Sequence, residues 1–209
     1  MIDEMLKFFV LFFVVVEPIT LVPLFAALTE GNEDFRRRMA LKAVIVSGIV
    51  LLLFALGGAW FLRMMNISID AFRIAGGVML FLIALEMVFA RESGTRVTAE
   101  EKNESRKRAD ISVFPLAFPF IAGPGAIAIV LLTFGAPRPE PMLAVGLFGV
   151  VMLVLAIAYA LMRLTPAVMR VMGVTGAHVV SRLAGVVLAA LAVQFIIDGL
   201  NGAFGEIRL

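Results

Sequence analysis

The 209-residue chain has no cysteine and a single histidine, and charged residues make up only 16% of it. Without cysteine there is no disulfide, thiolate metal site or cysteine nucleophile, and one histidine gives little basis for a metal centre, so no metal site is expected. Hydrophobic residues make up 62% of the chain, and the mean hydropathy is +1.04. No polar region is long enough for a second, soluble domain. We therefore expect one membrane domain covering residues 1–209.

Six apolar runs are long enough to cross a bilayer, which takes about 20 residues of α-helix. They lie at about Met5–Leu28, Met39–Leu62, Ala71–Ala90, Ile111–Thr133, Met142–Met162 and Val179–Phe204. The predicted fold is an all-α membrane protein with six transmembrane helices. The first four residues, Met1-Ile2-Asp3-Glu4, include two acidic ones, and no small-residue cleavage site follows them, so no cleavable signal is expected.

Basic residues are distributed unevenly among the connections between these runs. Residues 29–38, 91–110 and 163–178, with Lys42 and Arg182 counted beside them, carry 13 Lys and Arg, against four in the termini and the other two connections. By the positive-inside rule these three connections are cytoplasmic and both termini lie outside. The net charge of +2 reflects these loops, and no nucleic-acid partner is expected.

The first apolar run is interrupted by Glu17-Pro18-Ile19-Thr20, and a second proline follows at Pro23. Glu17 lies roughly 18 Å into the run, near the middle of a bilayer, at about 1.5 Å per residue. Pro18 removes a backbone donor and disfavours helical backbone at Glu17, so the helix is expected to break there. Freed backbone groups at this depth require protein or a water-filled cavity to receive them, which makes the break a candidate binding site.

Two sequence matches indicate an internal repeat. Arg73-Ile74-Ala75-Gly76 recurs as Arg182-Leu183-Ala184-Gly185, and Gly123-Pro124-Gly125-Ala126 lies about as deep in the fourth run as Glu17 does in the first. The repeats would cover about residues 1–90 and 111–209, joined by the cytoplasmic loop at 91–110. Because each repeat crosses the membrane three times, the second repeat starts on the opposite side and has the inverted orientation. Inverted repeats with matching broken helices, here the first and fourth, are typical of transporters that bind substrate near the midplane.

Both breaks have the chemistry of a site for a small zwitterion. Pro18 and Pro124 each suit the first position of a new half-helix, whose free N–H groups and dipole attract a carboxylate. Glu17 would hold an ammonium group or carry a proton. The candidate substrate-binding residues are Glu17, Pro18, Ile19, Thr20, Gly123, Pro124, Gly125, Ala126 and Gln194. Gln194 either lines the cavity or bridges helices, and the alternative for the breaks is that their prolines only kink packed helices.

Four more charges lie in the third and sixth runs. If these runs pack antiparallel, Arg73 meets Asp198 near the outer side and Arg182 meets Glu86 near the inner side. Such pairing lowers the cost of charge in a membrane. Together with Glu17, these are the candidate coupling or gate residues. The alternative is that they are structural pairs, or side chains that reach the interface.

These features resemble the MarC family, described as six-span small neutral amino acid transporters. The resemblance covers essentially the whole chain and is carried by Glu17–Pro23, Ala71–Gly77, Ala122–Ile127 and Gln194–Leu200. The family usually shows Asp or Asn before the first proline and glycine two residues after it, where this chain has Glu17 and Thr20. Both departures narrow the expected site. The resemblance implies a carrier for glycine, alanine or similar amino acids in the prokaryotic inner membrane.

The expected function is secondary transport of small neutral amino acids by alternating access, because no phosphate-binding loop for ATP is present. Proton coupling through Glu17 and sodium coupling through exposed carbonyls are both open, and no other cofactor is expected. No nucleophile–base or metal constellation supports an enzyme. The alternatives are a non-transporting membrane partner or assembly protein, or an exporter of another small metabolite. The expected partners are the substrate and the bilayer, with a homo-oligomer left open.

Overall fold

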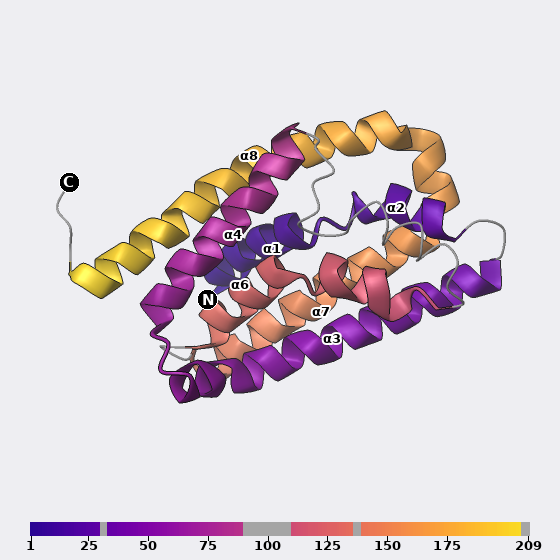
Figure 1. Ribbon diagram of the computed structural model, residues 1–209. Coiled ribbons are helices and arrows are strands. Elements are labelled where there is room, and N and C mark those ends of the chain that lie inside the picture. Colours follow the sequence, from indigo (N-terminus) through magenta and orange to yellow (C-terminus); the bar gives the residue numbers. More distant parts are fainter. Residues whose placement is uncertain (30–32, 90–109, 136–138, 206–209) are drawn as a thin grey trace.

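The computed structural model describes residues 1–29, 33–89, 110–135 and 139–205, which form helical segments and no β-strand. In chain order these are α1 (Ile2–Val16), α2 (Leu21–Leu28), α3 (Glu33–Met64), α4 (Ile69–Phe89), η1 (Ser112–Ile121), α6 (Pro124–Gly135), α7 (Pro141–Arg163) and α8 (Thr165–Phe204) (Figure 1). Five candidate membrane spans are present, and η1 with α6 makes a sixth if that bent pair is one span. The all-α membrane architecture is confirmed.

The sixth helix is much longer than predicted. Residues 163–178 were expected to be a connection, but α8 begins at Thr165 and continues to Phe204 with one kink at Gly173. The Thr165 hydroxyl donates to the Met162 carbonyl at 2.7 Å, and a proline in the first turn suits a helix start. Gly173 has φ 61°, a left-handed conformation that costs glycine little, so the helix bends there instead of ending. Except for Asp110, the predicted loop at 91–110 lies outside the described residues.

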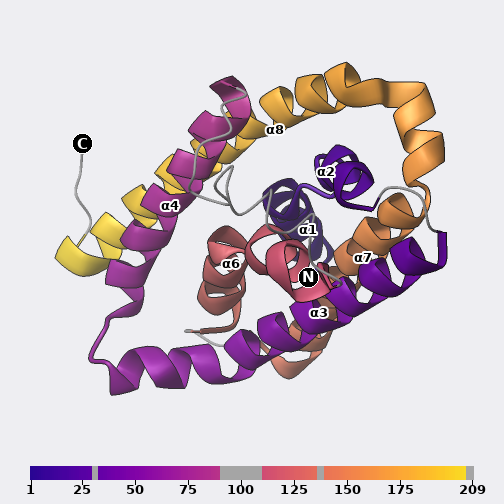
Figure 2. The ribbon, with the colours of Figure 1, turned by 45° about the vertical axis from the view of Figure 1, so that its right-hand side comes forward.

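The long helices α3 and α8 lie on opposite sides of the inner segments α1 and α6 (Figure 2). α3 packs against η1, α6 and α7, while α7 also packs against α1 and α2. On the other side α4 packs against α6 and α8, and α8 packs against α2. Figure 2 shows α1 and α6 enclosed by α3, α4, α7 and α8. The interrupted spans are therefore central, where the largest buried side chains include Phe12, Phe25 and Ile129.

α4 and α8 pack against each other in opposite directions, as predicted for the third and sixth runs. A Cβ on Gly199 would lie 2.9 Å from the Asp70 carbonyl oxygen, and one on Gly185 would lie 3.1 Å from the Ala84 carbonyl oxygen. Contact positions thus rise along α4 as they fall along α8. Small residues that let two backbones approach closely are typical of membrane helix pairs.

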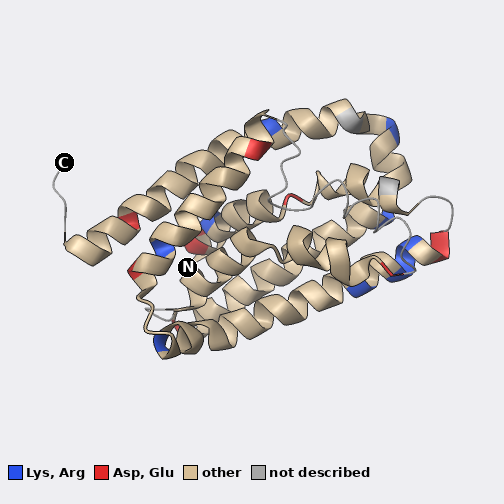
Figure 3. Ribbon diagram, viewed as in Figure 1, with Lys and Arg blue, Asp and Glu red and all other residues tan. Residues whose placement is uncertain are grey.

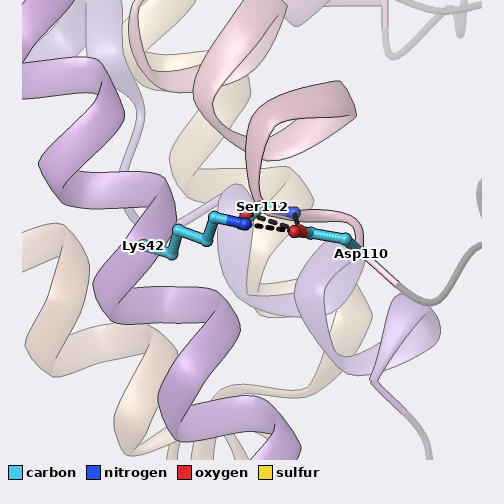
Figure 4. A network of polar contacts seen from close by, with 3 residues as sticks. All are labelled: Lys42, Asp110 and Ser112. Atoms are coloured by element: carbon cyan, nitrogen blue, oxygen red, sulfur yellow. Dashed lines mark hydrogen bonds and ion pairs between the residues drawn. The ribbon is translucent and has the colours of Figure 1, made fainter.

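Most charged residues lie toward the ends of the helices, and the central lengths of the bundle carry few (Figure 3). One polar link ties the start of η1 to α3. Asp110 accepts hydrogen bonds from Lys42 and from the Ser112 backbone N–H, the latter at 2.9 Å (Figure 4). The Lys42 ammonium, followed by the two donors of Ser112, lowers the pKa of Asp110 from 3.8 to about 2. This carboxylate lies just before the span that begins at Ser112.

Asp110→Asn is expected to lower the melting temperature of the purified protein slightly at neutral pH, by a few degrees at most. The side chains are half-exposed, at 52% for Lys42 and 43% for Asp110, so solvent screens the pair and its contribution is below about 1 kcal/mol. Because the folded pKa is lowered, the stabilisation is present above about pH 4 and is lost as the pH falls toward 2. Thermal melts in detergent across this range should converge for the two proteins. A constant difference at every pH would contradict this assignment.

Candidate functional site

The first span is interrupted between Val16 and Leu21. Glu17 ends α1 in a left-handed conformation, with φ 49° and ψ 53°. Its carbonyl oxygen accepts the N–H groups of Thr20 at 3.0 Å and Leu21 at 3.2 Å, which closes a tight turn. The break is present where Pro18 predicted it, but α2 begins at Leu21. Pro18 therefore lies inside the turn, and the prediction that it opens the half-helix is wrong.

The Glu17 side chain is only 6% exposed and is bonded to two hydroxyl groups. Its Oε1 accepts a hydrogen bond from Ser181 Oγ of α8 at 2.9 Å and a longer one from Thr20 Oγ1 at 3.4 Å. Thr20 is thus beside the carboxylate, as predicted. Ser181 was not predicted, although a hydroxyl next to Arg182 of the repeated motif was a usable signal.

The fourth span is more irregular than the single predicted break. α6 begins at Pro124 as expected, and it is bent by 57° from η1. Within η1 the residues before two prolines, Phe114 and Phe118, have extended backbone with φ −126° and −128°. The Ala122 N–H reaches the Ala117 carbonyl at 2.8 Å, the i→i+5 pattern of a widened helix. The two Phe-Pro pairs were the sequence signal, because proline disfavours helix at the preceding residue.

Backbone N–H groups are left over where α6 begins. The Ile127 N–H donates to the Gly123 carbonyl at 3.0 Å, but the backbone hydrogen bonds of the described chain include none from the N–H groups of Gly125 and Ala126. First-turn amides have no partner inside their own helix. Gly123 packs so closely that a Cβ would lie 2.1 Å from the Pro119 carbonyl oxygen, which only glycine allows.

The two breaks lie next to each other because the first and fourth spans run antiparallel. Away from the breaks, the rings of Phe8 in α1 and Phe134 near the end of α6 have centroids 6.4 Å apart. Nearer the breaks, a Cβ on Gly125 would lie 3.0 Å from Val15 Cγ1. A small hollow of about 10 Å³, room for about one water molecule, lies between these segments. Its walls are Val15, Ile83, Pro119, Phe120, Gly123, Pro124, Gly125 and Ala126.

The remaining predicted residues lie elsewhere. Gln194 is exposed on α8 and donates to Asp198 Oδ1 at 2.7 Å on the same helix, and it is not among the walls of the hollow, which was one of the two roles expected for it. Ala192 of α8 is buried, and a residue two positions along a helix points to a different side. Ile19 is half-buried in the first break.

Neither predicted ion pair is formed. Between described residues, the ion pairs include neither Arg73 with Asp198 nor Arg182 with Glu86. Arg73 instead pairs with Asp70 at 3.2 Å, one turn away on the same helix. The two predicted ion pairs are therefore wrong, although the antiparallel helix packing on which they depended is present.

Interrupted, buried spans that face each other within a bundle of apolar helices define a multi-pass helical membrane protein. Residues 2–204 match the family described as MarC family integral membrane protein, and the chain belongs to this family. The resemblance expected from the sequence is confirmed.

Relatives of similar length come from distant bacteria. The UPF0056 membrane protein YhcE of Escherichia coli is 34% identical over 199 residues, covering 95% of this chain and 92% of that protein. The UPF0056 membrane protein YvbG of Bacillus subtilis is 36% identical over 198 residues, covering 94% and 93%. A UPF0056 membrane protein of Aquifex aeolicus is 34% identical over 196 residues, covering 93% and 91%. No solved structure matches the chain significantly.

Proposed function

We propose that this protein is a secondary transporter of small neutral amino acids such as glycine and alanine, which it binds between the two breaks. The observation that carries the proposal is the adjacency of two buried breaks with opposite electrostatic character. One holds the buried Glu17 carboxylate, and the other is the start of α6, whose first-turn amides at Gly125 and Ala126 have no acceptor within their own helix. A zwitterion supplies the matching charges, with its ammonium toward Glu17 and its carboxylate toward the start of α6.

The packing around Gly125 supports a very small substrate. A Cβ there would lie 2.9 Å from Leu80 Cδ2 and 3.3 Å from Ile83 Cδ1, so the backbone itself lies close to α4. The small hollow is bounded mostly by glycine, proline and alanine from the second break. Such walls suit a substrate side chain of a hydrogen or a methyl group, and they leave little space for a branched one.

The helix contacts support an inverted repeat. In an inverted repeat, η1 would correspond to α1, α6 to α2, α7 to α3 and α8 to α4. Each contact between two helices should then have a counterpart between the two corresponding helices. α3 packs against η1 and α6, and α7 packs against α1 and α2. Likewise α4 packs against α6, and α8 packs against α2. A pattern preserved in this way favours alternating access, in which one repeat rocks against the other around a fixed site.

We place the chain in the inner membrane with both termini outside, because the basic residues of 29–38, 91–110 and 163–178, the last at the junction of α7 with α8, favour the cytoplasmic side. Transport would be driven by a proton or sodium gradient, with Glu17 as the ionisable group closest to the site. No catalytic step or further cofactor is part of the proposal.

Counterflow of radiolabelled glycine in proteoliposomes tests this function. Vesicles preloaded with unlabelled glycine should accumulate label well above protein-free vesicles, and external alanine should compete while leucine should not. Imposing a proton or a sodium gradient in parallel identifies the coupling ion. Flux equal to that of protein-free vesicles would contradict transport, and would favour a non-transporting partner or assembly role.

A further inference from the structure

One hydrogen bond joins the first break to the last helix. Ser181 and Glu17 are 164 positions apart in the chain, and their side chains meet at 2.9 Å. Glu17 is buried and Ser181 is half-buried. Since the two residues belong to different proposed repeats, any rocking of one repeat against the other must strain or break this bond.

The part of α8 that carries Ser181 is bounded by a kink and a tight contact. The kink is at Gly173, where no atom lies within 4 Å of an added Cβ, so local packing does not hold the bend. The tight contact begins at Gly185, where a Cβ would lie 2.8 Å from Met87 Cβ on α4. Between them, residues 174–184 follow an arc beside α2, which Figures 1 and 2 both show. The Ser181–Glu17 bond is a hydrogen bond that joins this arc to the candidate site.

We propose that Ser181 is a positioning residue that holds the arc of α8 closed over the site until a substrate amine takes its place on Glu17. Ser181 is a neutral donor, whereas an ammonium group makes a charge-assisted and therefore stronger bond to a carboxylate. Substrate binding exchanges the donor at Oε1 and releases residues 174–184 to move about Gly173. The inference rests on the proposed function, because it requires an amine at Glu17.

The consequence is a competition that mutation can remove. The apparent affinity for a ligand falls with the fraction of protein whose site is free to bind it. Because Ser181 occupies Glu17 in the absence of substrate, the protein binds substrate more weakly than it would without this serine. Ser181→Ala is therefore expected to lower the KM for glycine uptake about tenfold, the order expected for one hydrogen bond to a charged group. Ser181→Thr retains a hydroxyl and should keep the wild-type KM.

The absence of cysteine allows a single introduced thiol to report the position of the arc. Ala177 is 3% exposed and lies one turn before Ser181. In Ala177→Cys protein in proteoliposomes, maleimide labelling should be slow alone and several-fold faster with saturating glycine. Adding Ser181→Ala should give fast labelling without glycine, whereas adding Ser181→Thr should not.

Ser47→Ala is the control for loss of a serine hydroxyl, because Ser47 Oγ donates to the Ala43 carbonyl at 2.8 Å and to the Ala117 carbonyl of η1 at 3.5 Å, and not to Glu17. It should change neither KM nor labelling. Wild-type glycine flux with no effect of Ser181→Ala on labelling or KM would overturn this inference and leave the proposed function intact. Absence of flux in the wild type would instead overturn the proposed function, and with it the displacement of Ser181 by substrate.

Discussion

Glu17→Gln is expected to reduce glycine uptake at subsaturating concentration by about 10- to 100-fold. Gln has nearly the same shape and still offers a carbonyl oxygen to Ser181 and Thr20, so the turn at the first break should persist. It loses the negative charge that would bind an ammonium group, and a hydrogen bond to a charged partner is worth about 1.5–3 kcal/mol. Each 1.4 kcal/mol is a factor of ten in binding. Initial uptake rates in proteoliposomes measure the effect.

Glu17→Asp is the matched control because it keeps the charge on a shorter side chain. It should retain saturable uptake, while the Gln variant should elute from a size-exclusion column as the wild type does. Wild-type uptake with unchanged pH dependence in the Gln variant would rule out an essential ionisable role for this residue. It would also leave the kink interpretation of the first break as the better one.

Gly123→Ala should strongly impair folding, because an added Cβ has its closest contact at this position among the described glycines. The new Cβ would lie 2.1 Å from the Pro119 carbonyl oxygen, which is backbone and has no rotamer to move into. Overpacking of this severity costs of the order of 3 kcal/mol or more. We expect loss of monodisperse protein, or a melting temperature lower by ten degrees or so, together with loss of uptake. Size-exclusion profiles and thermal melts in detergent measure both.

Gly149→Ala is the control for adding a methyl to a membrane helix. Gly149 is an exposed residue of α7, and nothing lies within 4 Å of its added Cβ. Alanine costs a helix less than glycine does, so this variant should melt at or slightly above the wild-type temperature. If Gly123→Ala melts within the same narrow range, the close approach of Pro119 to the break is wrong.

The features that the sequence predicted well are those set by local chemistry. Pro18 and Pro124 interrupt their spans because proline removes a donor and restricts its neighbour, whatever packs around it. Gly185 belongs to the motif that repeats Arg73–Gly76, and it lies in the close contact of α8 with α4. The family resemblance came from the same short motifs, and the match over residues 2–204 confirms it.

The features that the sequence predicted poorly depend on which side chains share a depth and a face. Arg73 pairs with Asp70 on its own helix, because two residues one turn apart can form an ion pair whatever helix packs beside them. Gln194 had a plausible depth but lies on the exposed side of α8, and depth alone does not fix a face. Ser181 reaches Glu17 only because α8 continues through the kink at Gly173, where a turn had been predicted.

Equilibrium binding of radiolabelled glycine to the purified protein tests the central claim most directly. If the two breaks form one zwitterion site, the wild type should bind glycine saturably at about one molecule per chain, with alanine competing. Glu17→Gln should lose at least tenfold in affinity while remaining folded. Equal glycine binding by wild type and Glu17→Gln, or no saturable binding by the wild type, would contradict the account.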